Sequence, residues 1–123
     1  MARPREFDLE EVLSKALMLF AKKGYNGTSI DDLVKATGLQ RGSIYKAFGS
    51  KRNIFETVLK DMISNFSPTI ENLDFLTVAI KELAPNDKVI RNHCKSIVGS
   101  EKKKYAEMLG NNLLTKVKEN QNG

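Results

Sequence analysis

The sequence predicts an all-α fold. Apolar residues recur at helical spacing from one end of the chain to the other, glycine or proline follows most of these segments, and no segment shows the strict alternation of a half-buried strand. With 123 residues, of which 41% are hydrophobic, the chain is long enough for one domain or for a small domain with an extension. We therefore expect a set of short helices around one core.

The N-terminal part predicts three helices. Asp8 is a candidate N-cap and Gly24 a candidate stop for a first helix over residues 8–23. Thr28 or Ser29 can cap a second helix, which Gly38 ends, and a third helix lies within residues 39–48. The apolar residues expected in the core of the second and third helices are Ile30, Leu33, Val34, Leu39, Ile44 and Phe48.

A longer fourth helix and three further helices follow. Ser50 is a candidate N-cap for a helix whose wide apolar face extends to Phe66, and Pro68 marks a break after it. Beyond Pro68, helical periodicity predicts helices over residues 70–83, 89–98 and 105–117. His93 and Cys94 lie on the sixth of these helices, where we expect them to pack in the interior, because two ligands do not make a metal site.

Positive charge is concentrated in one window of the sequence. Between residues 33 and 55 there is no Asp or Glu, and the basic residues are Lys35, Arg41, Lys46, Lys51 and Arg52. This surplus equals the formal net charge of the whole chain, which is +5. Localised positive charge favours a surface for a polyanion, whereas a solvated helix face, which is the alternative, normally mixes both signs.

The second and third predicted helices have the spacing of a helix-turn-helix. A short turn that contains Gly38 joins them, and their apolar residues would turn Ile44 inward and leave Arg41, Ser43 and Lys46 on a free face. An α-helix fits the major groove of B-DNA, where its N-terminal residues reach base edges and phosphate repels carboxylates. The sequence therefore predicts an N-terminal DNA-binding domain.

Three more residues of the third helix suit the same surface. Gly42 permits a close approach of the backbone to DNA, and Tyr45 offers a hydroxyl group for a phosphate. The side-chain amide of Gln40 can pair with adenine, although Gln is a poor helix cap.

Residues 7–63 resemble the N-terminal domain of the tetracycline-repressor (TetR) family of transcriptional regulators. The resemblance is carried by "ALMLFAKKGYNGTSIDDLVKATGLQRGSIYKAFGSKRNIF", with Phe-x-x-x-Gly-Tyr, Thr-Ser-Ile and Gly-Leu-x-x-Gly-x-Ile-Tyr-x-x-Phe in that order. It implies that residues 40–46 belong to the recognition helix and that Thr28, Ser29, Tyr45 and Lys51 contact phosphate. Gln40 stands where the family commonly has Ser, and Ala47 stands where it often has an aromatic residue or His, so the operator sequence stays open.

The expected division of the chain is a helix-turn-helix DNA-binding domain at 1–49, a connecting helix at 50–66 and a short helical C-terminal region at 67–123. The resemblance implies a homodimer on a palindromic operator, and the sixth and seventh helices are the expected seam. The three helices predicted after Pro68 can form only a small part of the wall of a ligand pocket, so binding of a small-molecule inducer is doubtful.

Other function classes find little support. The sequence offers no nucleophile–base pair, metal-ligand array or phosphate loop, so we expect neither an enzyme nor a cofactor. Nothing approaches the length of a membrane span and the start lacks a signal-peptide core, so we expect a cytosolic chain with Cys94 reduced. One alternative function stays open, in which the chain is a shortened regulator that acts as a protein-interaction or heterodimerisation module. The role of Arg3 and Arg5 also stays open, as either a disordered tail or a minor-groove arm.

Overall fold

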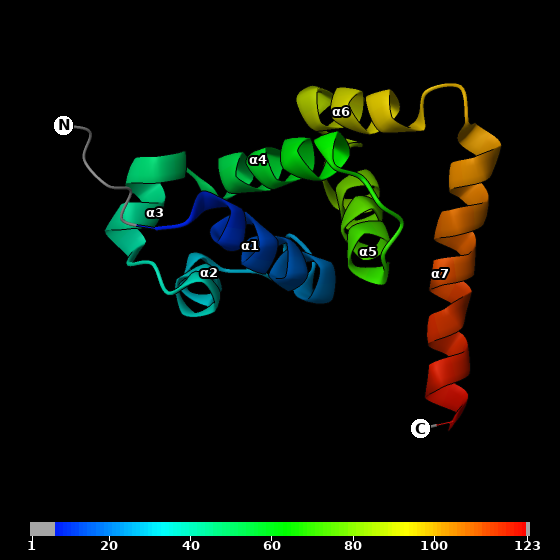
Figure 1. Cartoon of the computed structure of the whole chain (residues 1–123), viewed down its shortest axis with the longest axis horizontal. Helices are drawn as coiled ribbons and strands as arrows, with labels where there is room; N and C mark the ends of the chain where they lie inside the picture. Colours follow the sequence, from blue (N-terminus) through cyan, green and yellow to red (C-terminus); the bar gives the residue numbers. More distant parts are fainter. Residues whose placement is uncertain (1–6, 123) are drawn as a thin grey trace.

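The computed structural model describes residues 7–122, with side chains described through residue 117, and this part of the chain contains helices and no strand (Figure 1). In chain order the elements are α1 (Leu9–Lys23), α2 (Ile30–Thr37), α3 (Arg41–Phe48), α4 (Lys51–Ser64), α5 (Ile70–Val78), the π-helical turn η1 (Ala79–Leu83), α6 (Lys88–Val98) and α7 (Lys102–Asn122). The all-α prediction is confirmed. Arg3 and Arg5 lie outside the described residues.

The helix starts follow from short polar caps. The Asp8 carboxylate accepts the backbone N–H of Glu10 at 3.0 Å, and Ser50 Oγ accepts that of Asn53 at 3.0 Å, as the sequence predicts. The predicted fifth helix differs, because its second half widens into η1, where the N–H of Ala84 bonds to the carbonyl of Ala79. None of the described helices is long and apolar enough to cross a membrane.

The helices form an elongated arrangement. In Figure 1, α2 and α3 lie at one end, α7 stands at the other, and α4 runs alongside α1 between them. Helix α1 packs against α2 on one side and against both α4 and α5 on the other. The same helix thus braces the N-terminal helices and joins them to the C-terminal half.

The core is organised around Phe55. Its ring lies edge-on to Phe20 of α1, with centroids 5.0 Å apart, and is stacked on Phe75 of α5 at 4.5 Å. All three rings are fully buried. A fourth ring, Tyr25 in the α1–α2 loop, meets Phe55 edge-on at 5.4 Å. Offset and edge-on ring pairs add to the stabilisation from burial, so this cluster joins α1, α4, α5 and the loop before α2.

A carboxylate from η1 holds the α1–α2 loop. Oε1 of Glu82 accepts the backbone N–H of Asn26 at 2.9 Å. Gly24 ends α1 with φ +80°, and a Cβ there would lie 2.7 Å from Oε2 of Glu82. The positive φ favours glycine at this position, and any larger residue would also displace the Glu82 carboxylate.

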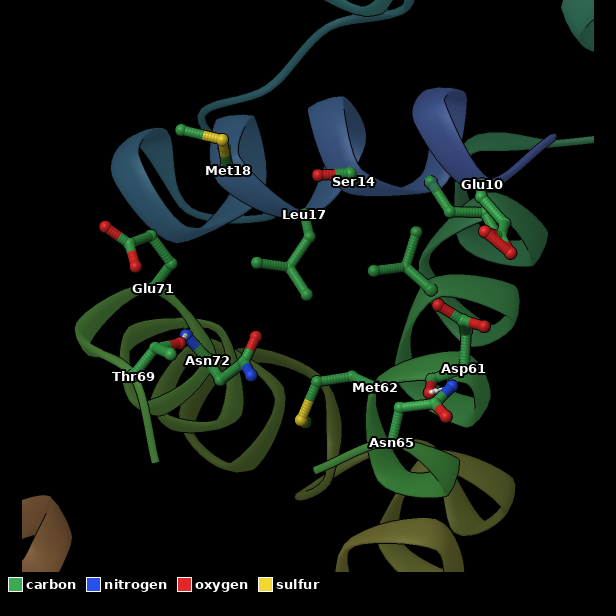
Figure 2. Close-up of a pocket in the computed structure, with 12 residues that line it drawn as sticks. Glu10, Ser14, Leu17, Met18, Asp61, Met62, Asn65, Thr69, Glu71 and Asn72 are labelled. Atoms are coloured by element: carbon green, nitrogen blue, oxygen red, sulfur yellow. Dashed lines mark hydrogen bonds between the residues drawn. The ribbon is translucent and has the colours of Figure 1, made fainter. Parts of the chain in front are cut away.

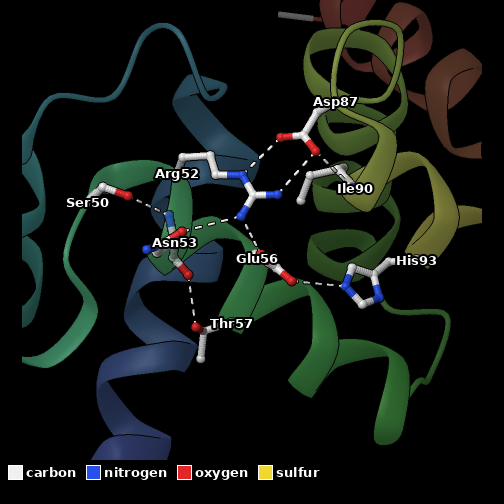
Figure 3. A network of polar contacts seen from close by, with 8 residues as sticks. All are labelled: Ser50, Arg52, Asn53, Glu56, Thr57, Asp87, Ile90 and His93. Carbon is white, nitrogen blue, oxygen red and sulfur yellow. Dashed lines mark hydrogen bonds and ion pairs between the residues drawn. The ribbon is translucent and has the colours of Figure 1, made fainter.

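Helices α4 and α6 are joined by a polar network (Figure 3). The Arg52 guanidinium donates to both carboxylate oxygens of Asp87, at 2.9 and 3.1 Å, and also pairs with Glu56. Nε2 of His93 lies 3.2 Å from Glu56, so the prediction that His93 packs in the interior is wrong: its ring is half-buried and belongs to this network. Its neighbour Cys94 is buried as expected, and burial raises the pKa of that thiol to about 11.

Two cavities open on the surface. One, of about 480 Å³, lies between α1, α4 and the start of α5 (Figure 2). The other, of about 640 Å³, is a mostly apolar groove between η1, α6 and the start of α7. Only the second of these lies wholly in the C-terminal half.

The aromatic cluster yields a stability prediction. Replacing Phe55 with Ala should lower the free energy of unfolding by about 3–5 kcal/mol, because it removes three ring contacts and leaves a cavity. Urea denaturation followed by circular dichroism measures the change. Val89→Ala, at a side chain that is 46% exposed, is the control and should cost less than about 1 kcal/mol. A Phe55→Ala loss as small as that of the control would contradict the assigned core.

The Arg52–Asp87 pair yields a pH prediction. The hydrogen bond from Arg52 lowers the pKa of Asp87 to about 2, from an ordinary value of 3.8. A carboxyl group whose pKa is depressed by folding stabilises the protein above its unfolded pKa, and this contribution is lost as the pH falls from about 4 to about 2.

Asp87→Asn keeps the cap on the N–H of Ile90 but removes the charge. At pH 7 this substitution should therefore lower the free energy of unfolding by about 1–2 kcal/mol, a figure reduced for partial solvent screening. It should also make the free energy of unfolding fall less steeply as the pH drops below 4. Chemical denaturation across pH 2–7 measures both effects, with exposed Glu107→Gln as the control. An Asp87→Asn curve parallel to that of the unmodified chain would refute the assignment.

Candidate nucleic-acid interface

The helix-turn-helix is formed by α2 and α3. Ser29 caps α2 with a reciprocal pair: its Oγ accepts the N–H of Asp32 at 3.0 Å, and its own N–H donates to the Asp32 carboxylate at 2.9 Å. The bond from the Ser29 backbone N–H, followed by that from the Lys23 ammonium, lowers the pKa of the Asp32 carboxyl group to about 2. Gly38 ends α2 in the left-handed conformation, φ +78°, and so turns the chain into α3.

One face of α3 is anchored in the core. Ile44 is 1% exposed and packs in the same core as Leu33 of α2, which is also 1% exposed. The other apolar residues expected in the core here are half-buried and pack against it: Ile30, Val34, Leu39 and Phe48. Buried residues on one side fix the orientation of α3 and leave its other side free.

The free side of α3 carries most of the predicted contact residues. The exposed ones are Gln40, Arg41, Gly42, Tyr45 and Lys46, and Ser43 is half-buried. Gln40 caps α3 through its backbone only, so its amide is not used as a cap. A Cβ added at Gly42 would meet nothing within 4 Å, so the backbone is open to a close approach. Helix α3 contains no acidic residue.

Arg41 has a neighbour that the linear sequence does not reveal. Its guanidinium pairs with the carboxylate of Asp31 on α2. Both side chains are more than half exposed, so the pair contributes little to stability. The pair lies at the N-terminal end of α3 and brings Arg41 beside α2.

Thr28 and Lys51 are used inside the protein. Thr28 is 1% exposed, and its hydroxyl donates to the carbonyl of Gly24 at 2.6 Å. The Lys51 ammonium donates to the carbonyls of Tyr25 and Thr28, both at 3.0 Å, and lies 4.1 Å from the centroid of the Tyr25 ring. In this conformation both residues shape the α1–α2 loop. A bond from the Thr28 hydroxyl to a phosphate would replace its bond to Gly24, whereas the Lys51 ammonium has a third N–H for a further acceptor.

Residues 33–55 contain no Asp or Glu, but in the folded chain some of their basic side chains have acidic neighbours. Arg52 faces Asp87 and Glu56, and Arg41 faces Asp31, so two of the five cations have carboxylate neighbours from outside the window. Lys35 and Lys46 are exposed, and no ion pair involves them among the described side chains. The positive surface is therefore narrower than the sequence suggests and is centred on α3.

Sequence reasoning missed Asp31 and Glu82. Asp31 looks like a simple first-turn acid of α2, ten residues before its partner Arg41. Glu82 lies 56 residues after the loop N–H that it binds. No local signal marks either contact, because both depend on how distant helices pack.

Comparison with known proteins identifies the N-terminal part. Residues 12–58 match the family described as bacterial regulatory proteins, tetR family. The chain is 42% identical over 65 residues to the HTH-type transcriptional repressor ComR of Escherichia coli, an alignment that covers 53% of the chain and 31% of ComR. It is 40% identical over 63 residues to the uncharacterized HTH-type regulator YezE of Bacillus subtilis, covering 51% and 32%.

A third relative matches over a similar length. The negative regulator IcaR of Staphylococcus aureus is 37% identical over 51 residues, covering 42% of the chain and 27% of IcaR. The chain therefore spans about a third of the length of these curated relatives.

The fold is shared with a solved structure of the TetR family regulator CifR, a cysteine mutant complexed with 26-bp operator DNA. The TM-score is 0.58 at 21% identity, over 92% of the chain and 74% of CifR. Residues 12–58, which include the helix-turn-helix, therefore match the tetR family of bacterial regulatory proteins, and the fold of the chain is that of CifR.

Proposed function

We propose that the chain is a sequence-specific DNA-binding transcriptional regulator, a homodimeric repressor that reads a palindromic operator through the helix at residues 40–48. The observation that carries this proposal is the free face of α3, which presents Gln40, Arg41, Tyr45 and Lys46 without a carboxylate of its own. Repression is supported by the relatives ComR, named a repressor, and IcaR, named a negative regulator. A regulator of this kind works in the bacterial cytoplasm and is not an enzyme.

We infer distinct roles for the contact residues. Arg41 and Gln40, at the N-terminal end of α3, are placed to read base edges, since Arg pairs with guanine and Gln with adenine. Tyr45, Lys46, Ser43 and the backbone at Gly42 suit phosphate contacts along the groove. For Ser29, Thr28 and Lys51 the contacts within the protein favour a supporting role, in which they hold the start of α2 against the backbone of the DNA.

We also propose a division of labour along the chain, with DNA binding at 1–49, a connecting helix at 50–66 and dimerisation at 67–123. Because α1 packs against α4 and α5, these parts share one core and are divided by role rather than by folding.

For the dimer seam we propose one face of α7. A neighbouring face is held by α5, where Asp74 accepts from Asn112 at 2.7 Å and pairs with Lys116 at 2.9 Å. The free face carries Leu113 and Val117, which are 49% and 54% exposed, beside the still more exposed Leu114. Exposed apolar rows of this kind mark sites of protein association. An antiparallel pair of these helices would bury the row around a two-fold axis.

The DNA proposal predicts a graded loss of binding. Lys46→Ala should weaken binding to DNA from the upstream region of the gene and lower the salt slope by about one charge, because one phosphate contact is removed. Combining it with Arg41→Ala and Tyr45→Phe should abolish specific binding. Gel-shift titrations at several salt concentrations measure both effects, and Lys60→Ala, an exposed lysine on α4, is the charge-matched control. Full binding by the triple variant would overturn the assigned face.

The seam proposal predicts a monomeric variant. Leu113→Glu together with Val117→Glu should raise the dimer dissociation constant by at least about tenfold, since two buried apolar side chains become charged. Sedimentation velocity over a concentration series measures the constant. Asn111→Glu, exposed on the other side of α7, is the matched control and should leave the dimer intact. If the unmodified chain stays monomeric at micromolar concentrations, the homodimer is refuted and association with a different partner becomes the better interpretation.

A further inference from the structure

We propose that the cavity between α1, α4 and the start of α5 binds a small organic cation with an apolar body. The cavity has a volume of about 480 Å³, which is within the usual range of small-molecule sites. Figure 2 shows its three sides, with Glu10 and Leu17 on α1, Asp61 and Met62 on α4, and Glu71 on α5. The site is separate from the DNA-facing side of α3, and the proposal does not depend on DNA binding.

The floor of the cavity is apolar. It is formed by Leu13, Val58 and Met62, which are buried, and by the half-buried Leu17. Met18 stands at the edge and is 54% exposed, although it is large and apolar. Methionine side chains adapt to the shape of a ligand, and a ligand with an apolar body would cover this exposed surface.

The rim of the cavity is negative. Each of the three helices supplies one carboxylate, Glu10, Asp61 and Glu71, and no Lys, Arg or His lines the cavity. This reverses the sign of the chain as a whole, whose formal net charge is +5. None of the three carboxylates is in an ion pair with a described side chain. A bound cation would supply the missing opposite charge.

Asp61 is the most informative of these residues. Glu10 and Glu71 lie in the first turns of α1 and α5, where a negative charge is favoured by the helix dipole. Asp61 instead lies in the last turn of α4, which ends at Ser64 and carries no basic residue there. The helix dipole disfavours a carboxylate at that end, so the stability of α4 does not account for Asp61. Asp61 is exposed and lines the cavity.

The arrangement selects the chemical class of the ligand. Within the described part of the chain no three acidic, His or Cys residues lie close enough to hold a metal ion, so the carboxylates do not form a metal site. Separated negative charges around an apolar floor instead match a cation whose charge is carried on a bulky hydrocarbon body. The negative rim also disfavours anions, including DNA.

The first test uses a pair of probes of nearly equal shape and opposite charge. Tetraphenylphosphonium and tetraphenylborate are titrated into the full chain carrying ¹³C-methyl methionine. The cation should shift the methyl signals of Met18 and Met62, which line the cavity, and leave that of Met108 on α7 unchanged. Equal shifts at Met18 and Met62 with the anion, or no shift with the cation, would overturn the proposal.

The second test removes charge without changing shape. Asp61→Asn with Glu71→Gln should weaken binding of the cation by roughly three- to tenfold, as expected for two exposed charge interactions. Calorimetry measures the affinity, and Glu107→Gln on α7 is the matched control. The single variant Asp61→Asn should leave the melting temperature unchanged or raise it, because it removes a charge opposed by the helix dipole. Unchanged affinity in the double variant, or a lowered melting temperature in Asp61→Asn, would refute the role assigned to the rim.

Discussion

The structure depends most on the burial of Phe55 between the rings of Phe20 and Phe75. These three side chains come from α4, α1 and α5, so their packing decides how the N-terminal helices meet the C-terminal half. Tyr25 extends the cluster into the α1–α2 loop, and Lys51 lies over the outer face of that ring. Because the cluster and the loop share contacts, the orientation of α2 and α3 depends on the hydrophobic core.

Polar contacts between residues distant in the sequence also hold the helices together. Glu82 binds the loop from η1, and Arg52 joins α4 to α6 through Asp87. Both contacts connect the helix-turn-helix side of the molecule with residues more than 30 positions later in the chain. The position of η1 therefore bears directly on the loop that precedes α2, and the position of α6 bears on the start of α4. The contacts that hold the helix-turn-helix end therefore include residues of the C-terminal half.

The charge pattern illustrates how sequence and structure differ. In the sequence, five cations stand together without an acid, and they suggest one broad positive surface. In the folded chain, Arg52 turns toward α6 and Lys51 toward backbone carbonyls, so α3 keeps a smaller set centred on Arg41 and Lys46. The cavity on the other side of α1 is negative although the chain is basic. Local charge is decided by which helices are neighbours, and net charge does not reveal it.

The sequence by itself determined the helices, the caps at Asp8 and Ser50, and the exposed face of α3, and it left the cap of α2 open between Thr28 and Ser29. These features depend on residues within about one helical turn of each other, and such spacing can be read directly. Only the tertiary structure decided that Thr28 is buried, that Asp31 meets Arg41 and that Glu82 reaches the loop. Each of these results from packing between helices that are distant in the chain or turned by a loop, and no local pattern encodes that geometry.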